Sequence, residues 1–66
     1  MEKKYLVVVY RNRSSLNDYN EFTDKEIAEH YYKYVLNKMK NQSEELKDHG
    51  FYIFDVRLYT LTEIGE

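Results

Sequence analysis

The stretch KYLVVVYR, residues 4–11, is rich in β-branched and aromatic side chains and has no helical spacing. Such a run is typical of a strand that is buried on both faces. Its two alternating sets of side chains are both apolar, Leu6, Val8 and Tyr10 on one side and Tyr5, Val7 and Val9 on the other. Each side of this strand therefore needs a cover.

A turn and a short second strand are predicted next. Residues 12–18, NRSSLND, have the Asn, Ser and Asp content of a loop. Tyr19–Phe22 alternates apolar and polar residues and is expected to return as a strand, which would complete a hairpin with the first strand.

A long helix is predicted from about Asp24 to Asp48. At its start, Thr23 and Glu26 have the spacing of a capping box, and Phe22 and Ile27 occupy the positions of a hydrophobic staple. At its end, Gly50 is placed to take a left-handed conformation in a Schellman motif. The stretch Asn41-Gln42-Ser43 has the weakest helix propensity, so any bend is expected there.

The last predicted strand, Phe51–Leu61, has two alternating sets of side chains. We expect the first set to face the core: Tyr52, Phe54, Val56 and Leu58. The second set would then lie on the opposite face: Phe51, Ile53, Asp55, Arg57, Tyr59 and Leu61. Together with Val7, Val9 or their neighbours, this second set would leave an apolar patch exposed.

These elements predict one α+β domain over residues 1–66, a ββαβ unit with an antiparallel sheet of order 2-1-3 and one long helix on one face. Without the hairpin, the prediction reduces to a two-stranded parallel βαβ unit, which would be too small to be stable alone.

Composition limits how so small a domain is stabilised and what it binds. The 66 residues include no Cys and two His, and the formal net charge is -2. Disulfides are excluded, and we expect self-association to support the small core. The charge gives no excess for binding polyanions. The apolar run near the N-terminus is too short for a signal peptide or a membrane span, so a cytoplasmic protein with no membrane contact is expected.

The sequence contains no pattern typical of catalysis. With Gly50 and Gly65 as the only glycines, the phosphate-binding fingerprints are absent. His30 has Glu26 and Glu29 nearby, a set that is more typical of a solvated helix face than of a metal site. The serines have no neighbouring His. We therefore predict a protein that is not an enzyme and carries no cofactor.

The segments KYLVVVY, EFTDKEIAEHY and GFYIFDVRLYTL give the chain a cadence that resembles small uncharacterised phage proteins of low-GC Gram-positive bacteria. The resemblance covers most of the chain and fixes no activity. It implies a factor that acts by binding, commonly as a dimer, in host takeover or against host defences.

The eight tyrosines favour half-buried surfaces, although an AT-rich codon bias would enrich tyrosine as well. We predict a protein-binding module that inhibits a host protein. The predicted partner-binding residues are Tyr5, Val7, Phe51, Ile53, Arg57, Tyr59, Tyr34 and Leu36. Alternatives are binding of single-stranded nucleic acid by strand aromatics, which the net charge disfavours, and a sponge for a nucleotide-like ligand at a subunit interface.

A homodimer is also expected from the excess of apolar surface. It would form through the second sheet face around Ile53 or, alternatively, through helices that pair by Tyr34, Leu36 and Met39.

Overall fold

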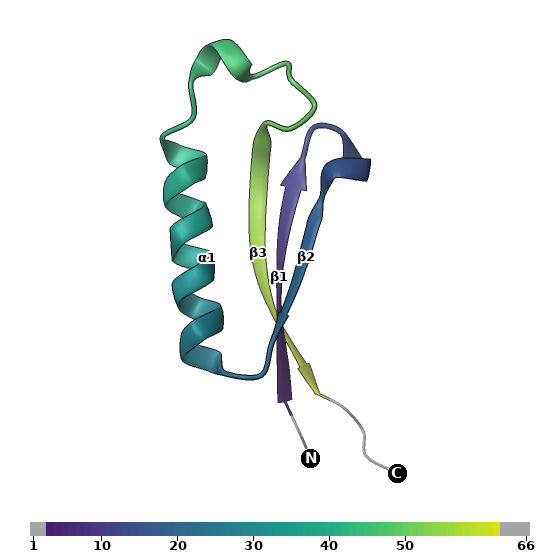
Figure 1. Cartoon of the computed structure of the whole chain (residues 1–66), viewed down its shortest axis with the longest axis vertical. Helices are drawn as coiled ribbons and strands as arrows, with labels where there is room; N and C mark the ends of the chain where they lie inside the picture. Colours follow the sequence, from purple (N-terminus) through teal and green to yellow (C-terminus); the bar gives the residue numbers. More distant parts are fainter. Residues whose placement is uncertain (1–2, 63–66) are drawn as a thin grey trace.

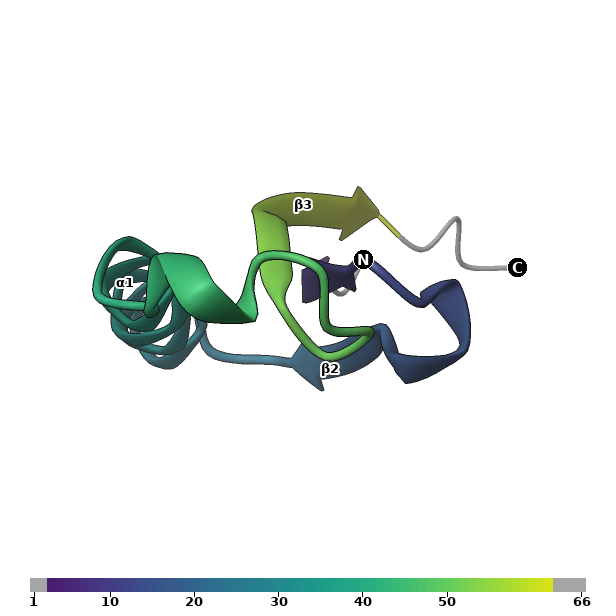
Figure 2. The same ribbon diagram turned by 90° about the horizontal axis from the view of Figure 1, so that it is seen from above.

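Three antiparallel strands and one α-helix make up most of the described part of the protein (Figure 1). The computed structural model describes residues 3–62; the expected single domain, residues 1–66, extends beyond this range at both ends. The elements are β1 (Lys3–Arg11), β2 (Asp18–Phe22), α1 (Lys25–Lys40) and β3 (Ile53–Thr62), and the strand order is β2-β1-β3. Viewed from above, α1 lies to one side of the sheet (Figure 2). The predicted ββαβ fold, including the hairpin, is confirmed.

The central strand β1 is buried on both faces, as predicted. Val7 and Val9 point toward α1 and pack with Val35 of the helix and with Ile53 and Val56 of β3. Partly buried side chains complete this core: Phe22, Tyr31, Tyr32, Leu36, Met39 and Leu58. Val8 points to the other face of the sheet and is also buried.

The helix begins one residue later than predicted, because Asp24 rather than Thr23 is the N-cap. The Asp24 carboxylate accepts hydrogen bonds from the backbone N–H groups of Glu26, at 2.8 Å, and Ile27, at 3.2 Å. The predicted capping box of Thr23 and Glu26 is therefore wrong. The predicted staple is also displaced, since Ile27 is exposed and Phe22 packs on Tyr31 instead.

The helix ends at Lys40, about eight residues before the predicted end and directly before the stretch of weak propensity. Sixteen residues span about 24 Å, which fits alongside the sheet, whereas the longer predicted helix would overrun it. Ser43 then caps a short 3-10 turn, Glu44–Leu46. Gly50 does not have a positive φ, so the predicted Schellman motif is wrong.

Gly50 instead allows the connection from α1 to β3 to approach the β1–β2 loop closely. Its C=O accepts a hydrogen bond from the Arg13 N–H at 2.8 Å, and a Cβ at position 50 would lie 3.1 Å from the Arg13 Cβ. The Asn12 side chain donates to the C=O groups of Lys47 and His49 in the same connection. These bonds join the two loops at one end of the sheet.

A β-bulge at Phe54 reverses the predicted faces at the start of β3. Tyr10 pairs with Asp55, but the next residue of β1, Arg11, pairs with Ile53, so Phe54 is the extra residue. Ile53 consequently joins the core, while Phe54 is 58% exposed. The strand also starts at Ile53 rather than at Phe51, which lies in the preceding loop.

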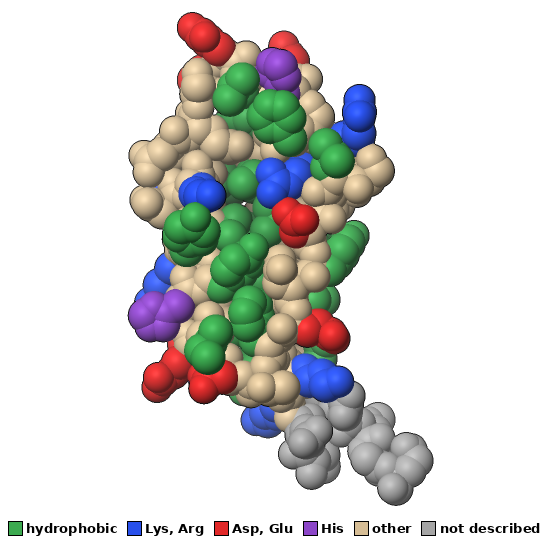
Figure 3. Space-filling view, viewed as in Figure 1, with side chains coloured by type: hydrophobic (Ala, Val, Ile, Leu, Met, Phe, Trp, Pro, Cys, Tyr) green, Lys and Arg blue, Asp and Glu red, His purple; other side chains and the backbone are tan. Residues whose placement is uncertain are grey.

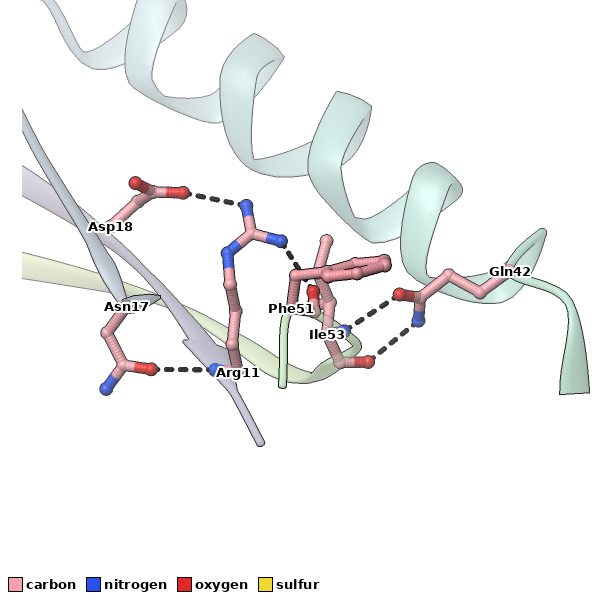
Figure 4. A network of polar contacts seen from close by, with 6 residues as sticks. All are labelled: Arg11, Asn17, Asp18, Gln42, Phe51 and Ile53. Carbon is pink, nitrogen blue, oxygen red and sulfur yellow. Dashed lines mark hydrogen bonds and ion pairs between the residues drawn. The ribbon is translucent and has the colours of Figure 1, made fainter. Parts of the chain in front are cut away.

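The Gln42 side chain holds the start of β3 in place (Figure 4). Its Oε1 accepts a hydrogen bond from the Ile53 N–H, and its Nε2 donates to the Ile53 C=O, both at 2.8 Å. Nε2 also donates to the C=O of Met39 at the end of α1. Beside it, Arg11 donates to the C=O of Phe51 and pairs with Asp18 at 2.7 Å. The helix end, the loop and the strand are thus tied together.

Substitution of the N-cap tests where the helix begins. Asp24→Ala should destabilise the protein by about 1 kcal/mol, because two N–H groups of the first turn lose their acceptor. Thr23→Ala is the matched control and should have a much smaller effect. Thermal unfolding of both variants measures the difference; a larger loss for Thr23→Ala would place the cap at Thr23 instead.

Gln42→Glu tests the contact at the start of β3. The change retains the shape of the side chain but removes both Nε2 bonds and directs a carboxylate at two C=O groups, so a loss of about 2 kcal/mol is expected in urea unfolding. Asn41→Asp adds the same charge one residue away and serves as the control. Equal stability of the two variants would contradict this role of Gln42.

Candidate functional site

The structure separates the predicted partner-binding residues rather than gathering them. Val7 and Ile53 were expected on an exposed sheet face, but both are buried under α1. The bulge moves Ile53 to the helix side, and α1 covers the side of β1 that carries Val7. Tyr5, which pairs with Phe22, lies on that same side and is partly buried, and Leu36 packs against the core.

The remaining predicted residues are accessible but lie on different surfaces. Phe51 is exposed in the loop before β3, where its ring is 5.2 Å from that of His49. Tyr34 is exposed on α1, with the Lys38 Nζ 4.8 Å from its ring centroid. Arg57 and Tyr59 lie together on the sheet face opposite the helix.

This opposite face, which we call the open face, is the most extensive candidate site. It consists of side chains from all three strands: Lys4, Leu6, Val8, Tyr10, Tyr19, Glu21, Phe54, Asp55, Arg57, Tyr59 and Leu61. Within residues 3–62, no second layer of helix or strand covers it (Figure 2). A three-stranded sheet with one helix therefore presents an aromatic surface.

Tyrosines and an arginine surround the central residue of the open face. Val8 lies between Tyr19 of β2 and Arg57 of β3 in the strand register and is only 2% exposed. The Tyr10 and Tyr59 hydroxyls share a hydrogen bond of 3.0 Å, and the Tyr10 ring centroid is 6.2 Å from that of Phe54. The hydrogen bond to Tyr59, and then desolvation, raise the pKa of Tyr10.

Asp55 and Arg57 form an ion pair on the open face. Arg57 Nε donates to Asp55 Oδ2 at 2.9 Å, and Asp55 Oδ1 accepts a hydrogen bond from the Val56 N–H at 2.9 Å. The hydrogen bond from Arg57 lowers the pKa of Asp55, and the same bond raises the pKa of Arg57. The guanidinium is thus engaged by its neighbour on the same strand.

A shallow hollow borders the open face along the outer edge of β3. Tyr32 of α1 lines one side of it, and consecutive residues of β3, Asp55 to Tyr59, line the other. Because consecutive strand residues point to opposite faces, the hollow follows the edge of the strand rather than either face.

A second apolar surface lies where α1 passes β2, and hydrophobic side chains gather along it in Figure 3. The rings of Phe22 and Tyr31 are 5.4 Å apart, and Tyr31 contacts Tyr34 at 6.4 Å. Ile27 and Tyr34 are exposed. The dimer expected through helices would use this side of α1 at Tyr34, but Leu36 and Met39 pack toward the core.

The sequence contained a signal for part of the open face. Tyr19 and Phe22 are three residues apart in β2, so their side chains lie on opposite faces of the sheet. Because Phe22 leads into the helix, it is expected on the helix side, which places Tyr19 on the open face. The position of Phe54 had no such signal, because the bulge that exposes it depends on how the loop before β3 is anchored.

Among the residues that the structure describes, no group of three or more His, Cys, Asp or Glu side chains could hold a metal ion. In the same residues, no helix combines the length and the apolar character needed to cross a membrane.

The ion pair gives a testable pH dependence. Because its pKa is lowered in the folded state, Asp55 should contribute stability above its ordinary pKa of about 3.9 and lose it as the pH falls through the folded-state value. Arg57→Gln should raise the pKa of Asp55, measured from the ¹³C shift of the carboxyl group. Arg11→Gln, the control, should leave the pKa of Asp55 unchanged; an equal rise in both variants would contradict the assignment.

Comparisons with known proteins do not place the chain in a family. No protein-family model, no curated protein and no solved structure matches it.

Proposed function

We propose that the chain is a protein-binding module without catalytic activity, and that the open face is its binding surface. The observation that carries the proposal is the row of aromatic side chains that the fold leaves in solvent: Tyr19 at 65%, Phe54 at 58% and Tyr59 at 38% exposure. Apolar patches of this kind on a small domain mark interaction sites.

The chemistry of the open face supports a protein partner. Protein interfaces are enriched in Tyr, Phe and Arg and depleted of charge at their centre. Here Tyr10 and Tyr59 are held by their mutual hydrogen bond, and Asp55 neutralises Arg57. Rigid aromatic side chains lose little entropy on binding.

The same chemistry disfavours single-stranded nucleic acid as the ligand. Strand aromatics that stack on bases work with cations that follow the phosphates. On the open face Arg57 is already paired with Asp55. The formal charges of the other two charged residues described on this face, Lys4 and Glu21, cancel, so the face has no excess of cations among them. The net charge of -2 acts in the same direction.

The finer parts of the proposal rest on the resemblance to small phage proteins and on the small size of the core. We propose that the partner is a cytoplasmic host protein that this chain inhibits, and that the chain acts as a homodimer. A domain of 66 residues without disulfides has few other means of support.

An affinity experiment with matched variants tests the binding surface. Tyr19→Glu places a charge on the open face and should abolish retention of a partner from a lysate of a low-GC Gram-positive bacterium. Tyr34→Glu changes a tyrosine on α1 of similar accessibility, at 56% exposure compared with 65% for Tyr19, and should leave retention intact. The partner retained by the wild type is identified by mass spectrometry, and the binding measurement is repeated with the purified partner.

Two results would contradict the proposal. Equal loss of the partner in both variants would remove the open face as the binding surface. Oligonucleotide binding that weakens steeply with salt, or a thermal shift with nucleotides, would favour the alternative ligands.

A further inference from the structure

The outer edge of β3 differs between its two halves. Among the described strands, β3 pairs with β1 alone, so its other edge has no strand partner. An unpaired edge presents backbone N–H and C=O groups from every second residue, because the alternate residues are bonded to the neighbouring strand. Which of these groups remain open determines what the edge can bind.

Side chains occupy the first half of this edge. Gln42 bonds both the N–H and the C=O of Ile53, and the Asp55 carboxylate accepts from the Val56 N–H. These bonds show which backbone groups face the outer edge. Because the N–H of Val56 is directed away from β1, the N–H and C=O groups of Leu58 and Thr60 are directed outward too, whereas those of Arg57 and Tyr59 are directed toward β1. The Arg11 N–H is consistent with this alternation, because it is directed away from β3 and donates to the Asn17 side chain.

Among residues 3–62, no side chain caps the second half of the edge in this way. Of the outward backbone groups of β3, both groups of Ile53 and the N–H of Val56 are bonded by side chains, whereas no described side chain bonds the N–H or C=O of Leu58 or Thr60. The hollow between Tyr32 and residues 55–59 extends along the edge into this half as far as Tyr59. A ligand that matches these open groups is an extended strand, whose backbone supplies alternating hydrogen-bond donors and acceptors.

We propose that this half of the edge binds the same segment of a second copy, which joins two sheets into one six-stranded sheet. Leu58 and Thr60 are the first two outward residues after Val56, which Asp55 caps, and Tyr59 lies midway between them. An antiparallel pairing with Tyr59 opposite its copy brings Leu58 opposite Thr60 of the second copy, twice. These two residue pairs contain four N–H groups and four C=O groups, and each N–H then donates to a C=O of the other copy. The pattern is reciprocal, as a two-fold axis requires.

This arrangement rests on the homodimer of the proposed function but differs from both geometries expected from the sequence. The two-fold axis is perpendicular to the sheet, so both helices lie on one side and both open faces on the other. The dimer therefore leaves the open face available to a partner and doubles its area.

Single-cysteine variants test the register, because the natural chain has no cysteine. Tyr59→Cys places two thiols opposite each other at a non-hydrogen-bonded pair, where the Cα atoms are about 4.5 Å apart and a disulfide fits. Leu61→Cys is the matched control, since Leu61 lies on the same face with the same exposure of 38%. Its copies would be roughly 14 Å apart along the strands. Mild oxidation should give a covalent dimer of the first variant only.

Backbone variants test the hydrogen bonds themselves. Thr60→Pro removes an outward N–H without removing a bond to β1, so the variant should keep its circular dichroism spectrum but have the monomer mass of 8.1 kDa by light scattering. Thr60→Val retains the N–H and should keep twice that mass.

Three outcomes would overturn the proposal: a monomeric wild type at millimolar concentration, equal cross-linking of both cysteine variants, or a dimeric Thr60→Pro protein. If Thr60→Pro does not fold, the cysteine pair still decides. These results are separate from the partner test, because Tyr19 lies on β2, at the other edge of the sheet. A monomer that still loses its partner with Tyr19→Glu would contradict the dimer alone.

Discussion

The structure depends on one constraint: β1 is apolar on both faces, and residues 3–62 contain one α-helix with which to cover them. Val7 and Val9 receive a conventional cover from Val35 and the aromatic side of α1. Val8 receives its cover from within the sheet, where Tyr19 and Arg57 flank it across the strands and exclude water. Tyrosine suits this position because it combines a large apolar ring with a polar hydroxyl that can remain in solvent. The same side chains that protect Val8 form the aromatic open face, so the stability of the domain and its capacity to bind have a common origin.

The loops control the orientation of β3 and therefore what each of its sides presents. Gln42 holds Ile53 at the end of α1, and the bonds of Asn12 and Arg13 to the connection position the loop before the strand. With its start fixed in this way, β3 accommodates Phe54 as a bulge, which turns Ile53 inward and Phe54 outward. Asp55 then caps the N–H of Val56. A bulge and a capped edge are both devices that limit uncontrolled strand pairing, and here they confine the accessible edge to the end of β3.

Much of the fold could be predicted from local pattern. The uniform apolar run of β1, the alternation of β2 and the weak propensity of residues 41–43 each act within a few residues. The errors came from interactions that local pattern does not encode. Thr23 and Asp24 are both good caps, and the geometry after β2 selects Asp24. Gly50 resembled a helix C-terminus, but its close approach to Arg13 is a contact between distant segments. The face of Ile53 followed from simple alternation, which the bulge breaks. That error explains the burial of Ile53, whereas Val7 was misplaced because both faces of β1 are equally apolar. Simple alternation also gave no reason to place Phe54 on the open face with Tyr10 and Tyr19.

The central claim is that α1 covers one face of the sheet, whereas the described residues leave two surfaces accessible. These are the open face and the second half of the outer edge of β3. Amide hydrogen exchange along β3, followed by NMR as a function of protein concentration, tests it most directly. The amides of Ile53, Val56, Arg57 and Tyr59 should be protected at every concentration, whereas those of Leu58 and Thr60 should exchange quickly in dilute solution and become protected as the concentration rises. Protection of Leu58 and Thr60 in the dilute monomer, or fast exchange of both at millimolar concentration, would contradict the account.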